Sequence, residues 1–458
     1  MNRHWKRSRV TKALTDAGLA ASFGEAEARL DAVRVCVRVS REQCSTPAGQ
    51  AATLTAVATA FKCFGRVCVA LDAPDADLRF KMPLGSTLHE ATERLGATTA
   101  DAEGAGITHS IRIGSAAHDD APWSVCCWWD RWLAGTRVDP GGPVGESGVS
   151  LAGVFSAGLA VRQIFADVRR AAACRSADVT VSLWTPSVPA DLNDVGPSQV
   201  SIPNHLWIVG LGHLGQAAVW ALLTLPSAGP RHAVLQDDDR IGEENEATSL
   251  LVRGNVFGLK KVRVAASWLE GGGWTTDLIE RRHKGDIRLI TGDPPLLLAG
   301  LDALPARKAL ARVCFDYMID VGIGDDAASF EGIQIRVVPK GTLVDRLWGS
   351  GSTADARERL SDNEAYRAAE KDIGACGKVM LADASVAVPF VGAAAAALAV
   401  SQAIRLASLK SGVALLQIEL ASPSLVIDGG EAAASESYLG SDVVSVRGDG
   451  EDPEMGLA

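Results

Sequence analysis

Short apolar runs alternate with longer helical patterns along the second half of the chain. The runs predict strands at HLWIVGLG, HAVLQDDD, IRLITGD and YMIDVGIG, and helices are predicted at 214–225, 260–269 and 305–313. Two later segments, 332–339 and 413–427, also have the pattern of strands. This alternation predicts an α/β fold with a mainly parallel sheet.

The first half of the chain repeats the pattern more weakly. It predicts a strand at 33–40, a helix at 48–61 and a strand at 66–75 that contains Asp72. A small-residue helix that follows Pro143 resembles another that follows Pro389. We interpret the two halves as copies of one module, although two unrelated helices that are both rich in Ala and Gly would look alike.

Composition shifts suggest where the parts of the chain begin and end. Residues 185–204 hold four prolines and lack a helical period, which is typical of a linker. We therefore predict a first domain at 1–184, this linker, and a second domain at 205–428. The remainder, 429–458, is acidic and rich in small residues, so it is expected to be flexible apart from a short edge strand at VVSVR.

Composition also excludes several classes of protein. The 458 residues are 47% hydrophobic and 22% charged, which rules out wholesale disorder. The net charge of −10 argues against a general nucleic-acid binder. The longest apolar run, Val386–Val400, is too short to span a bilayer. Nine cysteines without a Cys-x-x-Cys pair argue against a disulfide framework, so a cytoplasmic protein with reduced thiols is expected.

One glycine-rich turn carries a chemical implication. The sequence GLGHLG, with Gly210, Gly212 and Gly215, follows an apolar strand and opens a predicted helix. Glycines at such a turn let backbone N–H groups approach phosphate at a helix N-terminus. A glycine-rich packing turn without a ligand is the alternative, and His213 within it receives no role.

Several polar residues follow the next strand ends. Asp237 ends the second strand, where a dinucleotide dehydrogenase binds ribose hydroxyls, so a nicotinamide-dependent oxidoreductase is one candidate. The sequence contains no pointer to a hydride-transfer site, however. A nucleoside triphosphate site needs ribose acids, a phosphate lysine and a magnesium acid, and the chain offers these in order: Asp237, Asp238, Asp239, Asn245, Lys260, Lys261, Asp302 and Arg307.

These motifs resemble, in order and spacing, the ubiquitin-activating superfamily of ThiF/MoeB/HesA-type adenylyltransferases, over about residues 203–428. LQDDDRIGEEN resembles the family's Asp-x-Asp segment, GLKK its Gly-x-x-Lys, LDALPAR its magnesium segment and FEGIQIRVVP its Glu-Gly strand. The resemblance implies a Rossmann-like adenylation domain that uses ATP and Mg²⁺. It assigns Lys261 to the phosphates and Asp302 to Mg²⁺, and it assigns nucleotide binding to Gly210, Gly212, Gly215, Asp237, Asp239 and Asn245.

The chain departs from the family at three points. Thr248 stands where the family has a phosphate-binding arginine, Ala303 replaces the asparagine after the magnesium acid, and the zinc-binding cysteine pairs of many members are missing. Arg253 is one possible substitute for the arginine. The other is a basic residue of the N-terminal segment, because in this family an arginine reaches in from the partner half; the candidates are Arg3, Arg7 and Arg9.

Cys376 resembles the nucleophile of family members that form thioesters. It lies in GACGKVM, and Lys371 and Lys378 flank it and would favour the thiolate. An ordinary surface cysteine is the alternative. Cysteines in apolar runs are expected to be core thiols, and Cys314 is expected to serve packing.

The resemblance implies a complete reaction and its partners. A degenerate, inactive first module would form a pseudo-dimer with the active second module. That module would adenylate the C-terminal glycine of a ubiquitin-like protein, form a thioester at Cys376 and pass the acyl group to a conjugating enzyme. Bacterial antiviral conjugation is a further expectation, and no membrane or nucleic-acid partner is expected. Three alternatives stay open: the oxidoreductase, a pseudoenzyme scaffold suggested by Thr248, and adenylation of a carrier without a thioester.

Overall fold

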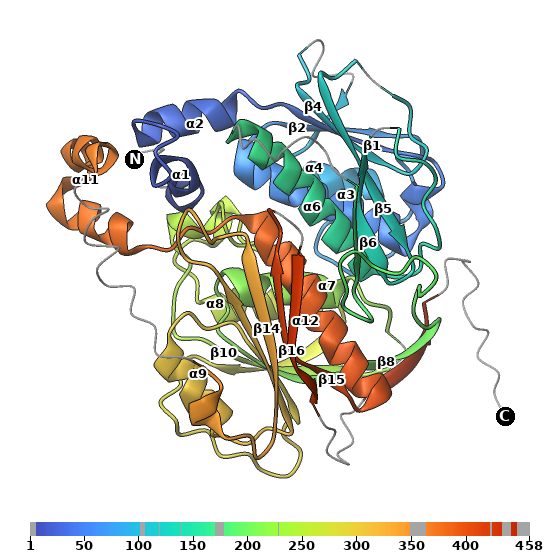
Figure 1. The fold of residues 1–458 in the computed structure, drawn as a ribbon, viewed down its shortest axis with the longest axis vertical. Coiled ribbons are helices and arrows are strands. Elements are labelled where there is room, and N and C mark those ends of the chain that lie inside the picture. Colours follow the sequence, from blue (N-terminus) through green and yellow to red (C-terminus); the bar gives the residue numbers. More distant parts are fainter. Residues whose placement is uncertain are drawn as a thin grey trace.

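Two α/β modules form the molecule. The computed structural model describes residues 6–100, 106–118, 120–138, 140–169, 178–227, 229–348, 363–421, 424–432 and 441–446. Each module contains one large sheet, and long helices lie between the two sheets (Figure 1). The predicted fold class, α/β with mainly parallel sheets, is confirmed.

The N-terminal sheet has seven strands in the order β3-β2-β1-β4-β5-β6-β7. The first five in this order are parallel, and β6 and β7 are antiparallel. The strand bounds are β1 Val35–Val39, β2 Val67–Leu71, β3 Thr98–Thr99, β4 His109–Ile113, β5 Trp123–Asp130, β6 Leu133–Val138 and β7 Val179–Ser182.

The C-terminal sheet repeats this order and adds one strand: β11-β10-β9-β12-β13-β14-β15-β16. Its first five strands are again parallel, and the remaining three are antiparallel. The strand bounds are β9 His205–Val209, β10 Arg231–Gln236, β11 Trp274–Ile279, β12 Leu296–Ala299, β13 Tyr317–Ile323, β14 Gly332–Pro339, β15 Gly412–Glu419 and β16 Ser424–Ala432.

The helices complete both modules. Those of the N-terminal module are α1 Ser8–Thr15, α2 Phe23–Asp31, α3 Pro47–Phe64, α4 Leu88–Arg94 and α6 Ser150–Val168. Those of the C-terminal module are α7 His213–Leu223, α8 Lys261–Gly271, α9 Leu304–Ala311, α11 Glu364–Asp383 and α12 Pro389–Leu409. Short 3-10 turns lie at Gln43–Ser45, Glu243–Asn245, Gly254–Val256 and Val344–Arg346. α3 shows its sequence signals clearly, because the Thr46 hydroxyl accepts from the Gly49 N–H and Gly65 ends the helix at φ +75°.

Small residues bring the two modules together. The helices α6 and α12, which share the small-residue pattern, pack against each other between the sheets, and α3 and α7 flank them (Figure 1). A Cβ at Gly158 would lie 3.0 Å from the Phe390 carbonyl oxygen, and one at Gly153 would lie 2.0 Å from that of Ala48. Both helices are long and apolar enough to cross a membrane, but 89% and 100% of their most apolar windows are buried inside the protein. They are therefore core helices of the protein.

Three segments differ from the sequence predictions. The strand predicted at IRLITGD is absent from the described residues, where this stretch is irregular and Ile290 is 73% exposed. The strand lies instead at β12, because LLLA is buried throughout. The predicted linker contains strand β8, Gln199–Pro203, which pairs with β17, Ser441–Ser445, near the predicted edge strand. The predicted domain end at residue 428 falls within β16.

A buried ion pair crosses the interface between the modules. The Arg162 guanidinium on α6 donates to the Glu331 carboxylate just before β14, with Nε and Nη2 at 3.1 and 3.0 Å from Oε2. The two side chains are only 8% and 4% exposed. Water cannot solvate either charge at this buried position, so each charged side chain is stabilised by the other.

We expect Arg162→Met to destabilise the protein by about 3–5 kcal/mol, because it leaves the buried Glu331 carboxylate unpaired. The double variant Arg162→Met/Glu331→Met should be more stable than the single variant, since neither charge remains. Calorimetric melting temperatures of the wild type and both variants measure this. A double variant that melts below Arg162→Met would contradict the account.

Candidate functional site

The glycine-rich turn lies at the carboxyl edge of the C-terminal sheet. Gly210 has φ +84°, and a Cβ there would lie 2.7 Å from the Gly300 carbonyl oxygen. A Cβ at Gly215 would lie 1.9 Å from the Gly210 carbonyl oxygen. These two glycines are therefore required by close backbone packing. Gly212 differs, because a Cβ there would meet no atom of the described residues within 4 Å. Its backbone faces open space.

The N-terminus of α7 follows this open backbone. Gly212 is the N-cap residue, and no side chain caps the first N–H groups of the helix. Uncapped N–H groups and the helix dipole together favour an anion. An anion such as phosphate therefore suits this helix start.

Asp237 ties this turn to the end of β10. Its carboxylate accepts from the Leu211 N–H at 2.6 Å and from the Asp239 N–H at 2.8 Å. Lys261 begins α8 beside it, and its Nζ lies 2.7 Å from the Asp239 carboxylate. The Lys261 side chain is 11% exposed, whereas that of Asp239 is 53% exposed. Three predicted residues therefore meet around the turn.

The acidic residues after β10 form a group of their own. Oxygens of Asp237, Asp238 and Asp239 lie within 4.8 Å of one another, a spacing that suits a metal ion. Lys261 already neutralises one of these charges. The predicted magnesium residue, Asp302, lies outside this group and is exposed just after β12.

Asn245 and Thr248 lie in the loop after β10, where both are buried. The Asn245 side-chain oxygen accepts from the Gly242 N–H at 2.9 Å, so Asn245 holds the loop's first turn. Thr248, which replaces the family's arginine, is 1% exposed. A hydroxyl here supplies no positive charge, so any phosphate needs another cation.

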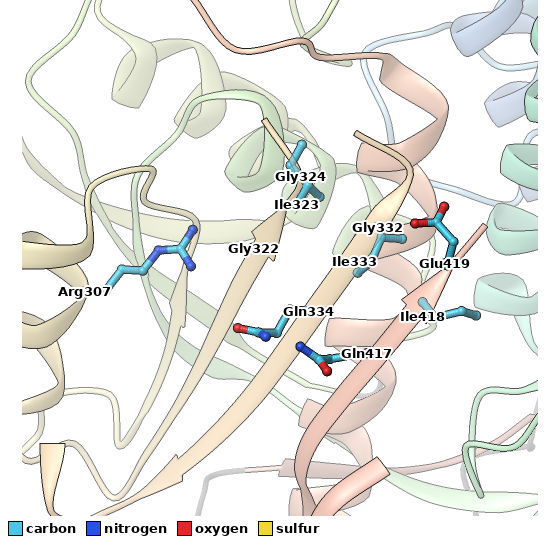
Figure 2. Close-up of a pocket in the computed structure, with 10 residues that line it drawn as sticks. All are labelled: Arg307, Gly322, Ile323, Gly324, Gly332, Ile333, Gln334, Gln417, Ile418 and Glu419. Atoms are coloured by element: carbon cyan, nitrogen blue, oxygen red, sulfur yellow. The ribbon is translucent and has the colours of Figure 1, made fainter. Parts of the chain in front are cut away.

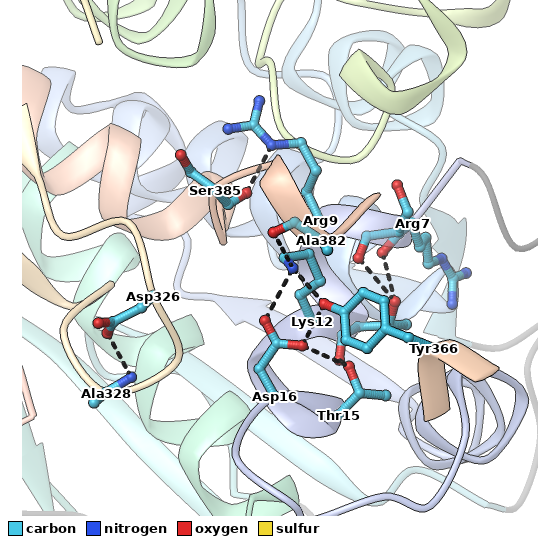
Figure 3. Close-up of polar contacts among 12 residues, drawn as sticks. Arg7, Arg9, Lys12, Thr15, Asp16, Asp326, Ala328, Tyr366, Ala382 and Ser385 are labelled. Carbon is cyan, nitrogen blue, oxygen red and sulfur yellow. Dashed lines mark hydrogen bonds and ion pairs between the residues drawn. The ribbon is translucent and has the colours of Figure 1, made fainter. Parts of the chain in front are cut away.

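Arg9 of α1 is such a cation. Burial lowers the pKa of the Arg9 guanidinium. The negative charges of Glu244 and Asp302 oppose this effect. Its Nε donates to the Ser385 carbonyl oxygen at 2.9 Å (Figure 3). The N-terminal helix therefore brings an arginine within electrostatic reach of Asp302, the predicted magnesium residue of the other module.

The other predicted arginines are engaged elsewhere. Arg7 pairs with Asp31 at 2.6 Å. Arg253 donates to the Arg94 carbonyl oxygen, and its guanidinium lies 5.8 Å from the centre of the Trp268 ring. Arg3 lies outside the described residues.

A buried polar cluster fixes α1 in this position. Lys12 Nζ lies 3.0 Å from the Asp16 carboxylate, and the Tyr366 hydroxyl donates to the same carboxylate at 2.6 Å (Figure 3). Lys12 also donates to the Tyr366 hydroxyl. Tyr366 belongs to α11, so the cluster joins the helix that carries Arg9 to the helix whose range includes Cys376.

His213 contacts the site although sequence analysis gave it no role. Its Nδ1 donates to the Thr248 carbonyl oxygen at 2.7 Å, and a Cβ at Gly392 would lie 2.7 Å from the ring. Burial lowers the pKa of His213 to about 4, and the charge of Arg9 adds to this, whereas the hydrogen bond opposes it. The neutral ring thus links the glycine-rich turn to the loop that holds Thr248. A histidine inside a glycine-rich turn was the signal available in the sequence.

A cavity of about 390 Å³ lies at the same edge of the sheet (Figure 2). Its floor is the end of β13, the start of β14 and the end of β15, and Ile323, Ile333 and Ile418 make part of it apolar. Arg307 lines one side and Glu419 the other (Figure 2). The sequence motifs included Arg307, but Glu419, Gln334 and Gln417 were missed. Gln334 lies in the FEGIQIRVVP segment, where only the Glu-Gly pair was singled out, and Gln417 and Glu419 come from a strand without any motif.

Arg307 and Glu419 give the cavity opposite charges. Arg307 lies 3.5 Å from the buried Asp320 carboxylate and donates through Nε to the Leu301 carbonyl oxygen at 2.7 Å. Burial raises the pKa of Glu419, and the nearby Glu331 charge adds to this, whereas the Arg162 charge opposes it. The cavity therefore has a charged side chain at each end, and the amide side chains of Gln334 and Gln417 lie between them (Figure 2).

Cys376 falls in the range of α11, but its side chain lies outside the described residues. Gly374 breaks the helix two residues earlier with φ +73°. Lys378 pairs with Glu370 at 2.8 Å, which reduces its effect on a nearby thiolate. Cys314 is exposed, so its predicted packing role was wrong. It lies beyond the end of α9 and has a left-handed φ of +66°. The six cysteines in the N-terminal module that are described are buried.

Comparisons with known proteins identify relatives along most of the chain. A family model described as the BilD C-terminal domain matches residues 202–410, and one described as the BilD N-terminal domain matches residues 34–183. A protein of Collimonas sp. (strain OK412), named bacterial E1-like protein BilD, is 33% identical over 415 residues, which is 88% of each chain.

Solved structures of E. coli MccB are more distant. The alignment with MccB has 14% identity and a TM-score of 0.32, and it covers 53% of this chain and 66% of that chain, just under two thirds. MccB with MccA-N7isoASN also has 14% identity, with a TM-score of 0.33 and coverage of 51% and 65%.

We expect His213 to stay neutral near pH 7, since burial holds its pKa at about 4. The unfolded chain takes up this proton with a pKa of about 6.5, so the group lowers stability as the pH falls from about 6.5 to about 4. NMR of labelled histidines measures this, and Arg9→Met should raise the His213 pKa because a nearby positive charge is removed. A His213 midpoint near pH 6.5 in the wild type would contradict the prediction.

Proposed function

This chain belongs to the BilD family of bacterial E1-like proteins, and we propose that it activates a carboxylate by adenylation with ATP. The observation that carries the proposal is a convergence at one sheet edge. An open backbone at Gly212 precedes the uncapped start of α7, Lys261 pairs with Asp239 nearby, and the charge of Asp302 acts on Arg9. An anion of high charge fits such a set, and α/β sheets bind ligands at this edge.

The residues fit a nucleotide and a magnesium ion. Gly210, Gly212 and Gly215 shape a turn that phosphate can approach, and Asp237 contacts this turn. The remaining predicted nucleotide residues follow on the segment after β10: Asp239, which pairs with Lys261, and Asn245. An exposed carboxylate such as Asp302 is a ligand that Mg²⁺ prefers. When bound, the ion would offset phosphate charge and polarise the reacting phosphate. Lys261, the α7 N–H groups and Arg9 would stabilise the charge that develops as the carboxylate attacks. Arg9 would then take over from the arginine that Thr248 replaces.

A protein tail is the proposed carboxylate donor. E1-like membership points to a ubiquitin-like protein, and a C-terminal glycine is narrow enough to reach the phosphate. The cavity at the same edge supports this, because amide side chains of Gln334 and Gln417 can pair with an extended backbone. Arg307 at one end offers a positive charge for the terminal carboxylate.

The N-terminal module is proposed to be inactive. After β1, where the other module has its glycine-rich turn, Gln43 is fully buried. A Cβ at Gly114 would lie 2.7 Å from Gln43 Cγ, and one at Gly49 would lie 2.1 Å from the Gln43 carbonyl oxygen. The chain itself therefore fills the space that a phosphate would need. Two sheets of the same strand order in one chain, one filled and one open, support an internal pseudo-dimer.

Transfer beyond the adenylate is the last part of the proposal. Cys376 would attack the acyl-adenylate, so that a thioester bond forms and AMP leaves. The thioester would then pass the acyl group to a conjugating enzyme. The link from α1 to α11 through Tyr366 supports a connection between the nucleotide site and this segment.

We expect Asp302→Ala and Lys261→Ala each to reduce ATP–pyrophosphate exchange by about a hundredfold or more, because Asp302 would hold the Mg²⁺ ion and Lys261 would offset phosphate charge directly. Asp75→Ala, which alters an exposed acid of the N-terminal module, should keep wild-type exchange. Exchange is measured with purified carrier protein, and calorimetry checks binding of ATP and of NAD. A folded Asp302→Ala protein with wild-type exchange would refute the role, and binding of NAD but not ATP would favour the oxidoreductase. A wild type that binds its carrier without turnover would favour the pseudoenzyme.

We expect Cys376→Ala to keep pyrophosphate exchange and to lose the reductant-sensitive adduct with the carrier protein, because adenylation needs no thiol. Cys314→Ala is the control, since Cys314 is a cysteine of the same module that is exposed to solvent. Non-reducing gels with carrier protein and ATP distinguish the variants. An adduct that survives in Cys376→Ala would assign the thioester to another cysteine.

A further inference from the structure

The loop between β10 and α8 connects several parts of the candidate site. It contains Asn245, whose side chain holds its first turn, and Thr248, whose carbonyl oxygen accepts from His213. Residues 250–252 are almost fully buried. A displacement of this loop would therefore move both Asn245 and the ring of His213 in the first turn of α7.

The N-terminal module holds this loop from outside. Lys62, near the C-terminal end of α3, donates from Nζ to the Glu246 carbonyl oxygen at 2.5 Å and to the Val252 carbonyl oxygen at 2.9 Å. The two acceptors lie in the middle part of the loop, on either side of Thr248, so one amine bridges this part of it. Lys6 pairs with the Glu246 carboxylate at 2.9 Å, and Arg253 returns a hydrogen bond to the Arg94 carbonyl oxygen.

We propose that Lys62 is a positioning residue for the nucleotide site, supplied by the N-terminal module. This inference rests on the proposed function, because it assumes that the site binds ATP. By bridging two carbonyl groups, Lys62 sets the shape of the loop and so the positions of Asn245 and His213. It touches no reacting atom. The N-terminal module thereby completes the nucleotide site of the C-terminal module.

The bridge depends on hydrogen-bond donation more than on charge. Burial lowers the pKa of Lys62 to about 7, and the nearby Arg253 charge adds to this, whereas Glu246 opposes it. A neutral amine still donates to both carbonyl groups. Loss of these donors would leave two carbonyl oxygens without their partner, which favours a different loop conformation.

The test compares Lys62→Met, which keeps the length of the side chain and removes its donors, with Lys62→Arg, which keeps donors. We expect Lys62→Met to raise the Kd for ATP·Mg about tenfold, the effect of one to two lost hydrogen bonds. The maximal rate of pyrophosphate exchange should stay within about twofold. Lys62→Arg should recover most of the affinity. Lys81→Met, which alters an exposed lysine of the same module, is the control and should match the wild type.

Hydrogen exchange of the nucleotide-free proteins provides a second measurement. Amides of residues 244–253 should exchange faster in Lys62→Met than in the wild type, whereas those of the N-terminal sheet should not. Unchanged exchange in the loop, or an unchanged Kd in a folded Lys62→Met protein, would overturn the role of Lys62 and leave the proposed function intact. A wild type that binds no ATP·Mg would overturn both.

Discussion

The close approach of small-residue helices between the two sheets is the contact on which the rest of the structure depends. Gly158 on α6 lies against the backbone of α12 at Phe390, and Gly153 lies against α3 at Ala48. A larger side chain at Gly158 would separate the two modules, and one at Gly153 would separate α6 from α3 within the N-terminal module. Because the helices meet so closely, side chains of one module reach the loops of the other. Arg162 reaches Glu331, and Lys62 reaches the loop after β10.

The candidate site is accordingly built from both modules. The C-terminal module provides the glycine-rich turn after β9, the acids after β10, Lys261 at the start of α8 and Asp302 after β12. The N-terminal segment provides Arg9, which α1 holds beside Asp302 because Lys12, Asp16 and Tyr366 fix the helix against α11. A phosphate at this edge would meet cations from two separate stretches of chain. This arrangement accounts for a threonine at position 248, where a nearby arginine would otherwise be needed.

The two modules differ in the loop that follows the first strand of each. Both sheets have the same strand order, so both place a loop at the same edge after their first strand. In one module this loop is glycine-rich and open at Gly212. In the other the buried Gln43 fills it. The N-terminal module, in which this loop is filled, can serve as a structural support for the C-terminal module.

The sequence by itself determined the parallel strands, most helices and the glycine-rich turn, because these depend on local periodicity and on backbone conformations that only glycine adopts readily. It also determined the order of Asp237, Lys261 and Asp302 at successive strand ends. It misassigned the strand at 287–293, since alternation there resembles a half-buried strand, whereas the buried run LLLA takes that place in the sheet. Only the tertiary structure decided that Arg9, and neither Arg7 nor Arg253, lies near Asp302, that His213 is buried and neutral, and that Lys62 bridges the loop. These contacts join residues far apart in the chain, and their geometry depends on how closely α6 and α12 pack, which no local pattern encodes.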